Sequence, residues 1–203
     1  AWLNLSLATD HSVTYLSMGQ SCCCPPNKDD EPELPLVALP KVAMGKRGGQ
    51  VKLVMCDGCT LAKGEGTALA DTIIEQDAAY WEVRVAANAG SCRVGVARDL
   101  NGMWLDSQIG DGDSSWALSS STVAFETGDV IGIAFGQDDM PNLKFYRNGS
   151  IINEASINRV RGEVFPAISV RDGAELEIIF EPQHFTHQPQ GRYTEIRPPR
   201  KML

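Results

Sequence analysis

The sequence contains no hydrophobic run long enough to cross a membrane. A membrane-spanning helix needs about 20 consecutive apolar residues, whereas the opening stretch 1–16 is interrupted by Asn4, Thr9 and Asp10. The same stretch lacks the positively charged start and the continuous apolar block of a secretory signal. We therefore expect a cytoplasmic protein that does not span the bilayer.

Positive charge is also scarce. The 203 residues include 18 Lys and Arg against 26 Asp and Glu, for a formal net charge of −8. A negative surface repels the phosphate backbone, which removes the main attraction for nucleic acid. Hydrophobic residues make up 43% of the chain and charged residues 22%, which is enough apolar material to form a buried core. We expect one globular domain with terminal extensions and no nucleic-acid partner.

Histidine is rare, and this weakens the case for catalysis. The three histidines are His11, His184 and His187, and all of them lie outside the strand-like blocks described below. A Ser-His-Asp or Cys-His arrangement therefore has no evident framework. The sequence also lacks a Gly-x-x-x-x-Gly-Lys phosphate-binding loop. These absences predict a protein that is not an enzyme and needs no cofactor.

The six cysteines do not suggest a disulfide framework. Cys22, Cys23 and Cys24 are adjacent to one another, while Cys56, Cys59 and Cys92 are scattered. Cys56-Asp-Gly-Cys59 has the spacing of half a zinc site, but no second pair supplies the four ligands that a structural site needs. We predict no metal, free thiols throughout, and a hairpin turn at 56–59 that carries small buried thiols.

The chain divides into three parts by composition. Residues 22–40 hold five prolines and several acidic side chains, which is typical of an extended linker. From residue 183 onward, prolines and basic residues recur without a period. The predicted organisation is an N-terminal extension with a Pro-rich acidic linker over 1–40, a domain over 41–182, and a basic Pro-containing tail over 183–203.

The central part has the pattern of short β-strands separated by turns. In 80–85, Trp81, Val83 and Val85 alternate with Tyr80, Glu82 and Arg84, as a half-buried strand requires. Segment 130–135 is apolar on both faces, which is typical of a central strand covered on each side. Further strands are expected at 93–97, 143–147, 151–152, 164–170 and 176–180. Because no segment has a sustained helical period, we predict an all-β fold, a bent antiparallel two-sheet β-sandwich with irregular N- and C-terminal extensions.

Two turns in this region are predicted in detail. Asn148-Gly149 and Asp172-Gly173 each separate two strand-like runs. Asn-Gly and Asp-Gly favour the positive φ angles of a two-residue hairpin turn. Asn148-Gly149 is therefore expected to form a hairpin, and Asp172-Gly173 is expected to form another tight turn between two strands.

Several sequence blocks together resemble the SPRY domain family, whose fold is concanavalin-like. The blocks are Tyr-Trp-Glu-Val at 80–83, Val-Gly-Val-Ala at 94–97, Gly-Asp-Val-Ile-Gly at 128–132, Phe-Tyr-Arg-Asn-Gly at 145–149 and Phe-Pro-Ala-Ile-Ser at 165–169. Ser-Trp-Ala-Leu at 115–118 resembles the buried-tryptophan strand of the family. The resemblance implies a non-catalytic adaptor that binds a protein or peptide partner through loops at one rim of the sandwich.

The candidate partner-binding residues lie on four connections of this expected sandwich. Apolar side chains in a polar loop are typical of a binding hot spot, and the alternative is that Trp104 folds back over the sandwich edge. The resemblance also places an earlier loop near 63–70 at the site, and loop 137–141 and turn 171–173 are expected near the same rim. The candidates are Leu100, Met103, Trp104 and Leu105, then Lys63 and Glu65, then Asp138, Asp139 and Met140, and finally Arg171.

The N-terminal extension contains a pattern typical of lipid modification. If Met18 is the true start, Gly19 becomes the N-terminus after methionine removal and precedes Cys22, Cys23 and Cys24. An N-terminal glycine followed by cysteines predicts myristate with palmitate, and two acyl chains give stable membrane attachment. The sixth position is Cys23 where the motif has serine or threonine, and the alternative is an internal Met18 within a flexible cysteine tract.

Two other function classes remain open at this stage. The chain is alternatively a constitutive structural subunit of a large cytoskeletal or ciliary assembly, or a lectin-like binder of small ligands. Ordered termini packed against neighbours would favour the first, and a concave pocket lined by aromatics and carboxylates would favour the second. No obligate homo-oligomer is predicted.

Overall fold

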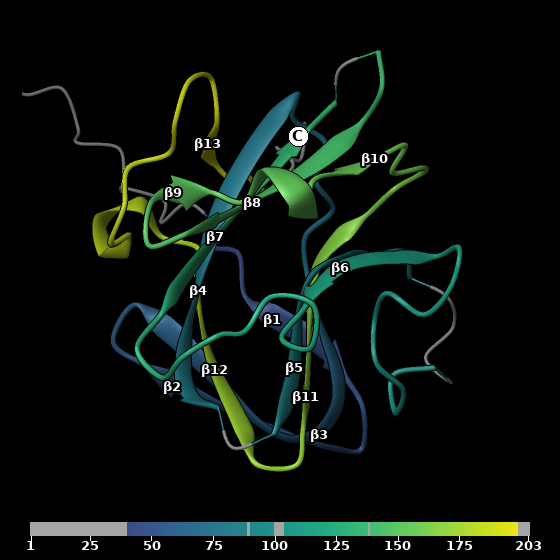
Figure 1. Ribbon diagram of the computed structural model, residues 1–203, viewed down its shortest axis with the longest axis vertical. Coiled ribbons are helices and arrows are strands. Elements are labelled where there is room, and N and C mark those ends of the chain that lie inside the picture. Colours follow the sequence, from purple (N-terminus) through teal and green to yellow (C-terminus); the bar gives the residue numbers. More distant parts are fainter. Residues whose placement is uncertain (1–39, 89, 100–103, 138, 199–203) are drawn as a thin grey trace, which may run out of the picture. The chain divides into compact units, whose positions relative to one another are not determined.

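The structure is a computed structural model that describes residues 40–88, 90–99, 104–137 and 139–198 (Figure 1). Within these ranges it consists of β-strands and two short 3-10 helices, η1 (Asn153–Ala155) and η2 (Pro182–His184), with no α-helix. The predicted all-β class is confirmed. The expected lipidation sites, Gly19 and Cys22–Cys24, lie outside the described residues.

The strands form two sheets that share one strand. Sheet A has the order β1 (Met44–Arg47), β3 (Cys59–Ala70), β11 (Phe165–Arg171), β5 (Ser91–Ala97) and β6 (Ser115–Ser119). Sheet B has the order β2 (Gln50–Cys56), β3, β12 (Ala174–Ile179), β4 (Ala78–Asn88), β7 (Val130–Gly136) and β8 (Asn142–Arg147). Short strands β9 (Ser150–Ile151) and β10 (Ile157–Asn158) pair with β8, and β13 (Thr194–Glu195) pairs with β4. All pairings are antiparallel except that of β13, which is parallel to β4.

Strand β3 passes from one sheet to the other. Its first part, 60–63, pairs with β12 in sheet B, and its last part, 66–69, pairs with β11 in sheet A. Where the strand changes sheets, Gly64 and Gly66 have φ angles of +102° and +124°, which residues with a side chain rarely adopt. A Cβ at Gly64 would also lie 2.1 Å from the Gln50 carbonyl oxygen. The expected loop near 63–70 is therefore wrong, because this stretch is the bent part of a strand.

The main core lies between the inner faces of the two sheets. The predicted alternation in β4 is confirmed on this face, since Trp81, Val83 and Val85 are fully buried. Side chains of β5, β7, β11 and β12 complete the same cluster. Burial of each large apolar side chain stabilises the fold by about 1.5–3 kcal/mol. Trp116 is only partly buried, so Trp81 is the tryptophan enclosed by the sandwich.

The outer face of sheet A is covered by the connection between β5 and β6. Residues of this connection, including Leu105 and Ile109, form a second apolar cluster with Leu69 and Ala167, and Trp104 packs against it. Hydrogen bonds fix the connection to the sheet: the Thr67 N–H donates to the Leu105 carbonyl at 2.7 Å, and the Ile109 N–H donates to Ser169 Oγ at 2.9 Å. This half of the sandwich therefore has little bare sheet surface.

The outer face of sheet B is covered by residues that follow β12. Phe185 packs edge-on against Tyr80, with ring centroids 5.3 Å apart. Beside them the Glu82 carboxylate is fully buried and accepts the N–H groups of Thr186 and His187 at 2.6 and 2.8 Å. Tyr80 and Glu82 are therefore buried rather than on the exposed face of a half-buried strand. The segment after β12 is held on this face by hydrogen bonds to Glu82, which the hydrophobic periodicity of the sequence does not reveal.

The Glu82 carboxylate also changes the chemistry of its neighbour. Tyr80 Oη donates a hydrogen bond to Glu82 Oε1 at 3.0 Å. Burial, followed by the negative charge of Glu82, raises the pKa of the Tyr80 phenol far above its ordinary value. The fold therefore stabilises the neutral Tyr80 phenol, which is the form that donates this hydrogen bond.

Both predicted tight turns are present, and Asn148-Gly149 joins the paired strands β8 and β9 as a hairpin. Asp172-Gly173 instead joins β11 of sheet A to β12 of sheet B, which pair with β3 rather than with each other. Asn148 and Gly149 have φ angles of +50° and +80°, and Asp172 and Gly173 have +56° and +85°. Positive values at both positions define the two-residue turn whose twist matches antiparallel strands. The Asn148 side chain accepts the Val130 N–H at 2.9 Å, so this turn is also fastened to the start of β7.

A buried carboxylate links the two sequence blocks around 128–132 and 145–149. Asp129 is 7% exposed and accepts hydrogen bonds from the Glu126 N–H, the Asn148 amide and the Arg147 guanidinium. Burial alone would raise the pKa of the Asp129 carboxyl, but these three donors outweigh it and lower the pKa below its ordinary value. The charged form is thus the one that the fold stabilises.

We predict that Asp129→Asn lowers the free energy of unfolding by about 1–3 kcal/mol at neutral pH, because buried donors lose a charged acceptor. A carboxyl whose pKa is lowered by folding contributes its full stabilisation above its unfolded pKa of about 3.9. That stabilisation is lost as the pH falls through the lower pKa of the folded state. Urea denaturation should therefore show a gap between wild type and variant that shrinks below about pH 4. Asp139→Asn, at an exposed position, is the control, and a gap independent of pH would contradict the assignment.

We predict that Trp104→Ala lowers the free energy of unfolding by about 1–3 kcal/mol, because the indole packs on the apolar cluster over sheet A. Thermal or urea denaturation measures the loss. Met140→Ala, at a side chain that is 56% exposed, should change stability by no more than about 0.5 kcal/mol. Unchanged stability in the Trp104 variant would instead favour the hot-spot interpretation of this loop.

Candidate functional site

Two adjoining hollows lie where several connections meet beside sheet A. Their volumes are about 480 and 450 Å³, and both are lined by Ile73, Asp99 and Phe165. Because they share these residues, we treat them as one groove. The remaining lining residues are Gly45, Lys46, Leu69, Ala70, Asp71, Thr72 and Glu75 in the first hollow, and Arg98 and Glu163 in the second.

The walls of the groove are held by backbone hydrogen bonds. Asp71 follows β3, and its N–H donates to the Ala43 carbonyl at 2.8 Å, while its carboxylate accepts the Ala43 N–H at 3.1 Å. Three residues later, the Ile74 N–H donates to the Val164 carbonyl at 3.0 Å. These bonds tie the connection after β3 to the residues that precede β1 and β11. The groove is therefore formed by fixed backbone at the ends of strands.

The groove combines an apolar floor with acidic walls. Phe165 and Ile73 are partly buried, and Leu69 lies beneath them at 1% exposure. Four carboxylates line it against two cations, and Lys46 forms an ion pair with Asp99. Glu75 and Glu163 are exposed and make no ion pair within the described residues. These two carboxylates are thus available to a cationic ligand.

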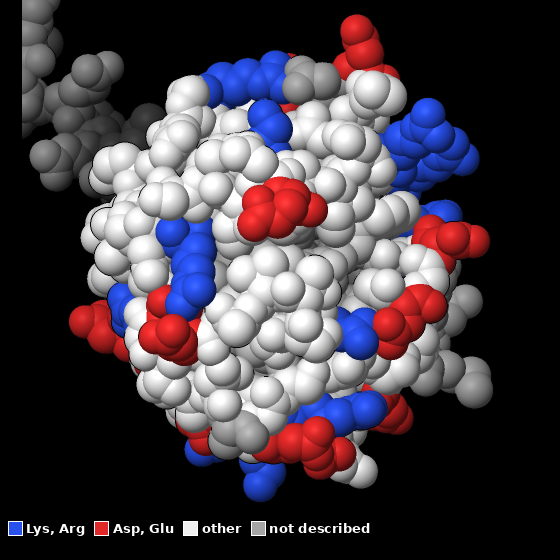
Figure 2. Space-filling model, in the orientation of Figure 1, with Lys and Arg blue, Asp and Glu red and all other residues white. Residues whose placement is uncertain are grey.

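One face of the molecule is mixed in charge. On the face shown in Figure 2, acidic and basic side chains are interspersed, and a broad uncharged area lies between them. No large patch of one sign is seen on that face. The face shown thus provides no extended basic surface of the kind that binds nucleic acid.

The structure places the predicted partner-binding residues at several separate locations. Leu100, Met103 and Asp138 lie outside the described residues. Leu105 is 5% exposed and belongs to the second apolar cluster, over sheet A, and Trp104 packs on the same cluster. The alternative placement of Trp104 over the sandwich edge is the one that the structure adopts.

The other predicted residues do not line the groove. Lys63 and Glu65 lie on the bent part of β3, where they pair with Glu175 of β12 and Gln50 of β2. Asp139 and Met140 are exposed on the connection between β7 and β8, and Arg171 is partly buried at the end of β11. These residues remain candidate partner-binding residues only on surfaces separate from the groove.

The expectation that loop 137–141 and turn 171–173 share one rim is wrong. Gly136 pairs with Ala78 at one end of β4, whereas Ala174 pairs with Asn88 at the other end. Ten residues of strand separate the two positions, which is about 33 Å at roughly 3.3 Å per residue. Figure 1 shows the β11–β12 turn at the lower end of the sandwich and the β7–β8 connection at the upper end.

Sequence reasoning missed the groove residues in 71–75 and at 163. The block 165–169 was identified only as strand, although alternation places Phe165 on the same side as Ala167, away from the main core. An aromatic side chain on the outer face at the start of a strand was therefore a usable signal. The acidic residues Glu75 and Glu163 carry no local pattern, because only the sheet topology brings them together.

The cysteine prediction requires a correction. Cys56 and Cys59 form a disulfide across the β2–β3 turn, with Cα atoms 5.0 Å apart, and Cys56 is exposed. The expectation of small buried free thiols is therefore wrong for this pair, because the facing positions of a two-residue hairpin bring the two Cβ atoms together. Cys92 is free and buried. Burial raises the pKa of its thiol.

The described residues contain no group of three or more His, Cys, Asp or Glu side chains placed to hold a metal ion. They also contain no helix of the length and apolar character needed to cross a membrane.

A solved domain structure shares this fold. The PSpry domain of TRIM65 is 15% identical, with a TM-score of 0.52, and the match covers 70% of this chain and 94% of that chain. A human SPRY domain is 18% identical, with a TM-score of 0.49, over 63% of this chain and 94% of that one. At such identities the likeness to TRIM65 concerns the fold alone. No curated protein sequence matches significantly.

The family is shown by the sequence itself. The SPRY domain model matches residues 78–183, just over half of the chain. The match begins at β4 and ends in η2, so it includes both tight turns and the Asp129 network. SPRY domains are generally non-catalytic modules for protein–protein interaction, and the chain belongs to the SPRY domain family.

Proposed function

We propose that this protein is a non-catalytic adaptor whose groove beside sheet A binds a partner segment that carries an apolar side chain flanked by basic residues. The observation that carries the proposal is that Phe165 lines both hollows, together with Glu75 in the first and Glu163 in the second. Both carboxylates are exposed and make no ion pair within the described residues. An apolar floor and acidic walls select complementary side chains.

The magnitudes indicate how the groove would work. Burial of one large apolar side chain supplies about 1.5–3 kcal/mol, whereas an exposed ion pair supplies at most about 1 kcal/mol. The apolar anchor therefore provides most of the affinity, and the carboxylates provide selectivity. Because the groove backbone is tied by hydrogen bonds to neighbouring strands, little of the binding energy is lost to ordering it.

A carbohydrate ligand is the second candidate for the same groove. Phe165 offers an aromatic surface, and the nearby Asp71 and Glu75 offer hydrogen-bond acceptors, which is the combination expected of a lectin-like site. Binding of neutral oligosaccharides with no dependence on salt would favour this candidate. A peptide partner would bind more weakly as salt rises. The structural-subunit alternative has no comparable support from the described residues.

We also propose N-terminal acylation, which would attach a cytoplasmic adaptor to membranes. We further propose that the chain is most similar to SPRY domain-containing protein 7. Three features support this narrower likeness: the short domain, the cysteine cluster and the Pro-rich connector. Intact-mass spectrometry of protein from eukaryotic cells should show one myristoyl group on Gly19 and palmitoyl groups on Cys22–Cys24. An unmodified mass, or an N-terminus that precedes Met18, would contradict it.

The groove is tested by the double variant Glu75→Lys and Glu163→Lys. Peptides selected from a random display library against the wild-type protein should be enriched in Arg or Lys next to an apolar residue. These peptides should bind the double variant at least about tenfold more weakly, because attraction is replaced by repulsion at two positions. Fluorescence anisotropy with labelled peptides measures the change.

The matched control is the double variant Asp57→Lys and Glu154→Lys. It changes the net charge by the same amount at exposed positions outside the groove. Its peptide affinity should stay within about twofold of the wild-type value. Equal losses in both double variants would show that net charge, rather than the groove, governs binding.

A further inference from the structure

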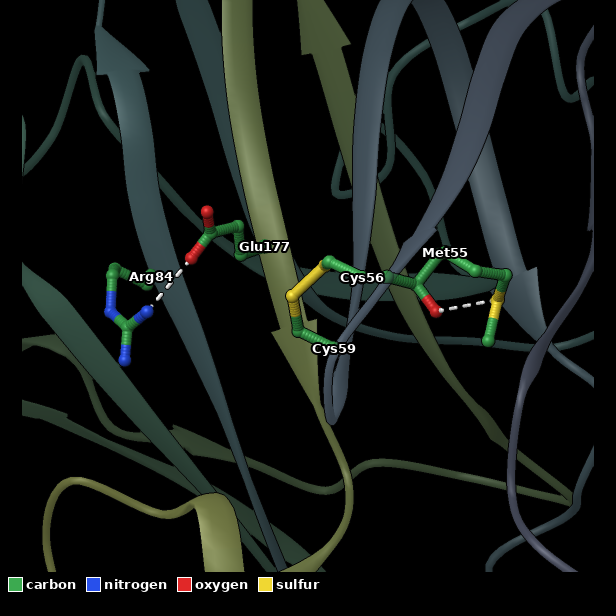
Figure 3. The surroundings of a disulfide bond; sticks show 6 residues. Met55, Cys56, Cys59, Arg84 and Glu177 are labelled. Carbon is green, nitrogen blue, oxygen red and sulfur yellow. Dashed lines mark hydrogen bonds and ion pairs between the residues drawn. A yellow bond between two sulfur atoms is a disulfide. The ribbon is translucent and has the colours of Figure 1, made fainter.

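The β2–β3 hairpin ends in a disulfide that the proposed binding function does not use. Figure 3 shows Cys56 and Cys59 joined at the tip of the hairpin, with Met55 beyond them on β2. The same figure shows the Arg84–Glu177 ion pair on the neighbouring strands of sheet B. The bond closes a loop of only two intervening residues, so it adds little constraint to the unfolded chain compared with a longer loop.

The hairpin does not need this bond to keep its shape. Seven residues of β2 pair in register with β3, and Val51 is anchored in the main core at 2% exposure. Gly58 has a φ of +71°, and a Cβ there would lie 2.2 Å from the His184 ring. The turn is thus held against the segment that follows β12. The two thiols should therefore stay close together after reduction.

The two cysteine residues differ in their exposure to solvent. Cys56 is exposed and Cys59 is partly buried. The surroundings of the bond are open, since Val54 and Met55 are 46% and 75% exposed. Thiol–disulfide exchange needs an attacking thiolate to reach one sulfur while the other leaves. This arrangement favours attack on Cys56 with Cys59 as the leaving thiolate.

We propose that Cys56 and Cys59 form a reversible thiol–disulfide exchange site for low-molecular-weight thiols such as glutathione. The first thiolate attacks Cys56 Sγ, forms a mixed disulfide with it, and releases Cys59 as a thiolate. A second thiolate then attacks the sulfur of the bound thiol, which leaves Cys56 as a thiolate and releases the oxidised small molecule. Overall, one protein disulfide and two small thiols give one protein dithiol and one small disulfide, and the two protons of the small thiols pass to the cysteines.

The full chain is treated with reduced glutathione and then oxidised glutathione, and each cysteine is read separately by alkylation and peptide mass spectrometry. Cys56 and Cys59 should become alkylated together on reduction and protected again on oxidation, while circular dichroism and the thermal transition show a folded domain throughout. Buried Cys92 should stay unmodified in the folded protein, because burial raises its thiol pKa. A pair that stays oxidised, or that opens only as the domain unfolds, would overturn the proposal.

Two single variants separate the roles of the sulfurs. In Cys59→Ser, the remaining Cys56 should form a mixed disulfide with oxidised glutathione, seen as the added mass of one glutathione. In Cys56→Ser, the partly buried Cys59 should react at least about tenfold more slowly. Equal rates would refute the assignment of Cys56 as the attacked sulfur. No adduct on either cysteine would refute the exchange site itself.

Discussion

The architecture depends on one strand that belongs to both sheets. Because β3 bends at Gly64 and Gly66, it pairs with β12 in sheet B and with β11 in sheet A. The bend turns the inner faces of the two sheets toward one another, so that Trp81 and its neighbours are enclosed in a single apolar cluster. A straight β3 would keep the strands in one open sheet with an exposed apolar face, which is unstable in water.

The domain also covers its outer faces with its own chain. The β5–β6 connection lies over sheet A, and the segment after β12 lies over sheet B, fastened by the buried carboxylate of Glu82. These coverings remove much of the flat strand surface that a partner could otherwise contact. The groove around Phe165, where we propose that recognition occurs, lies instead where strands end. This organisation agrees with the general role of SPRY domains as interaction modules.

The sequence predicts the strands well because their stability depends on local alternation and turn chemistry. Trp81, Val83 and Val85 show a period of two, and Asn148-Gly149 needs positive φ at adjacent positions. The site is predicted poorly because it depends on contacts between distant segments. Glu163 and Glu75 line adjoining hollows because β3 pairs with β11, and Leu105 is buried in an apolar cluster that forms only on folding. The Cys56–Cys59 bond was missed because composition, rather than hairpin register, guided that prediction.

Hydrogen–deuterium exchange with and without a bound peptide tests the central claim, that recognition is confined to the groove. If the peptide binds in the groove, amide exchange should become slower on binding in the segments around 43–46, 71–75, 98–99 and 163–165. No change is expected in the covering segments, 104–110 and 185–193, or in the β2–β3 hairpin. Protection centred on either covering segment, with none beside Phe165, would contradict the account.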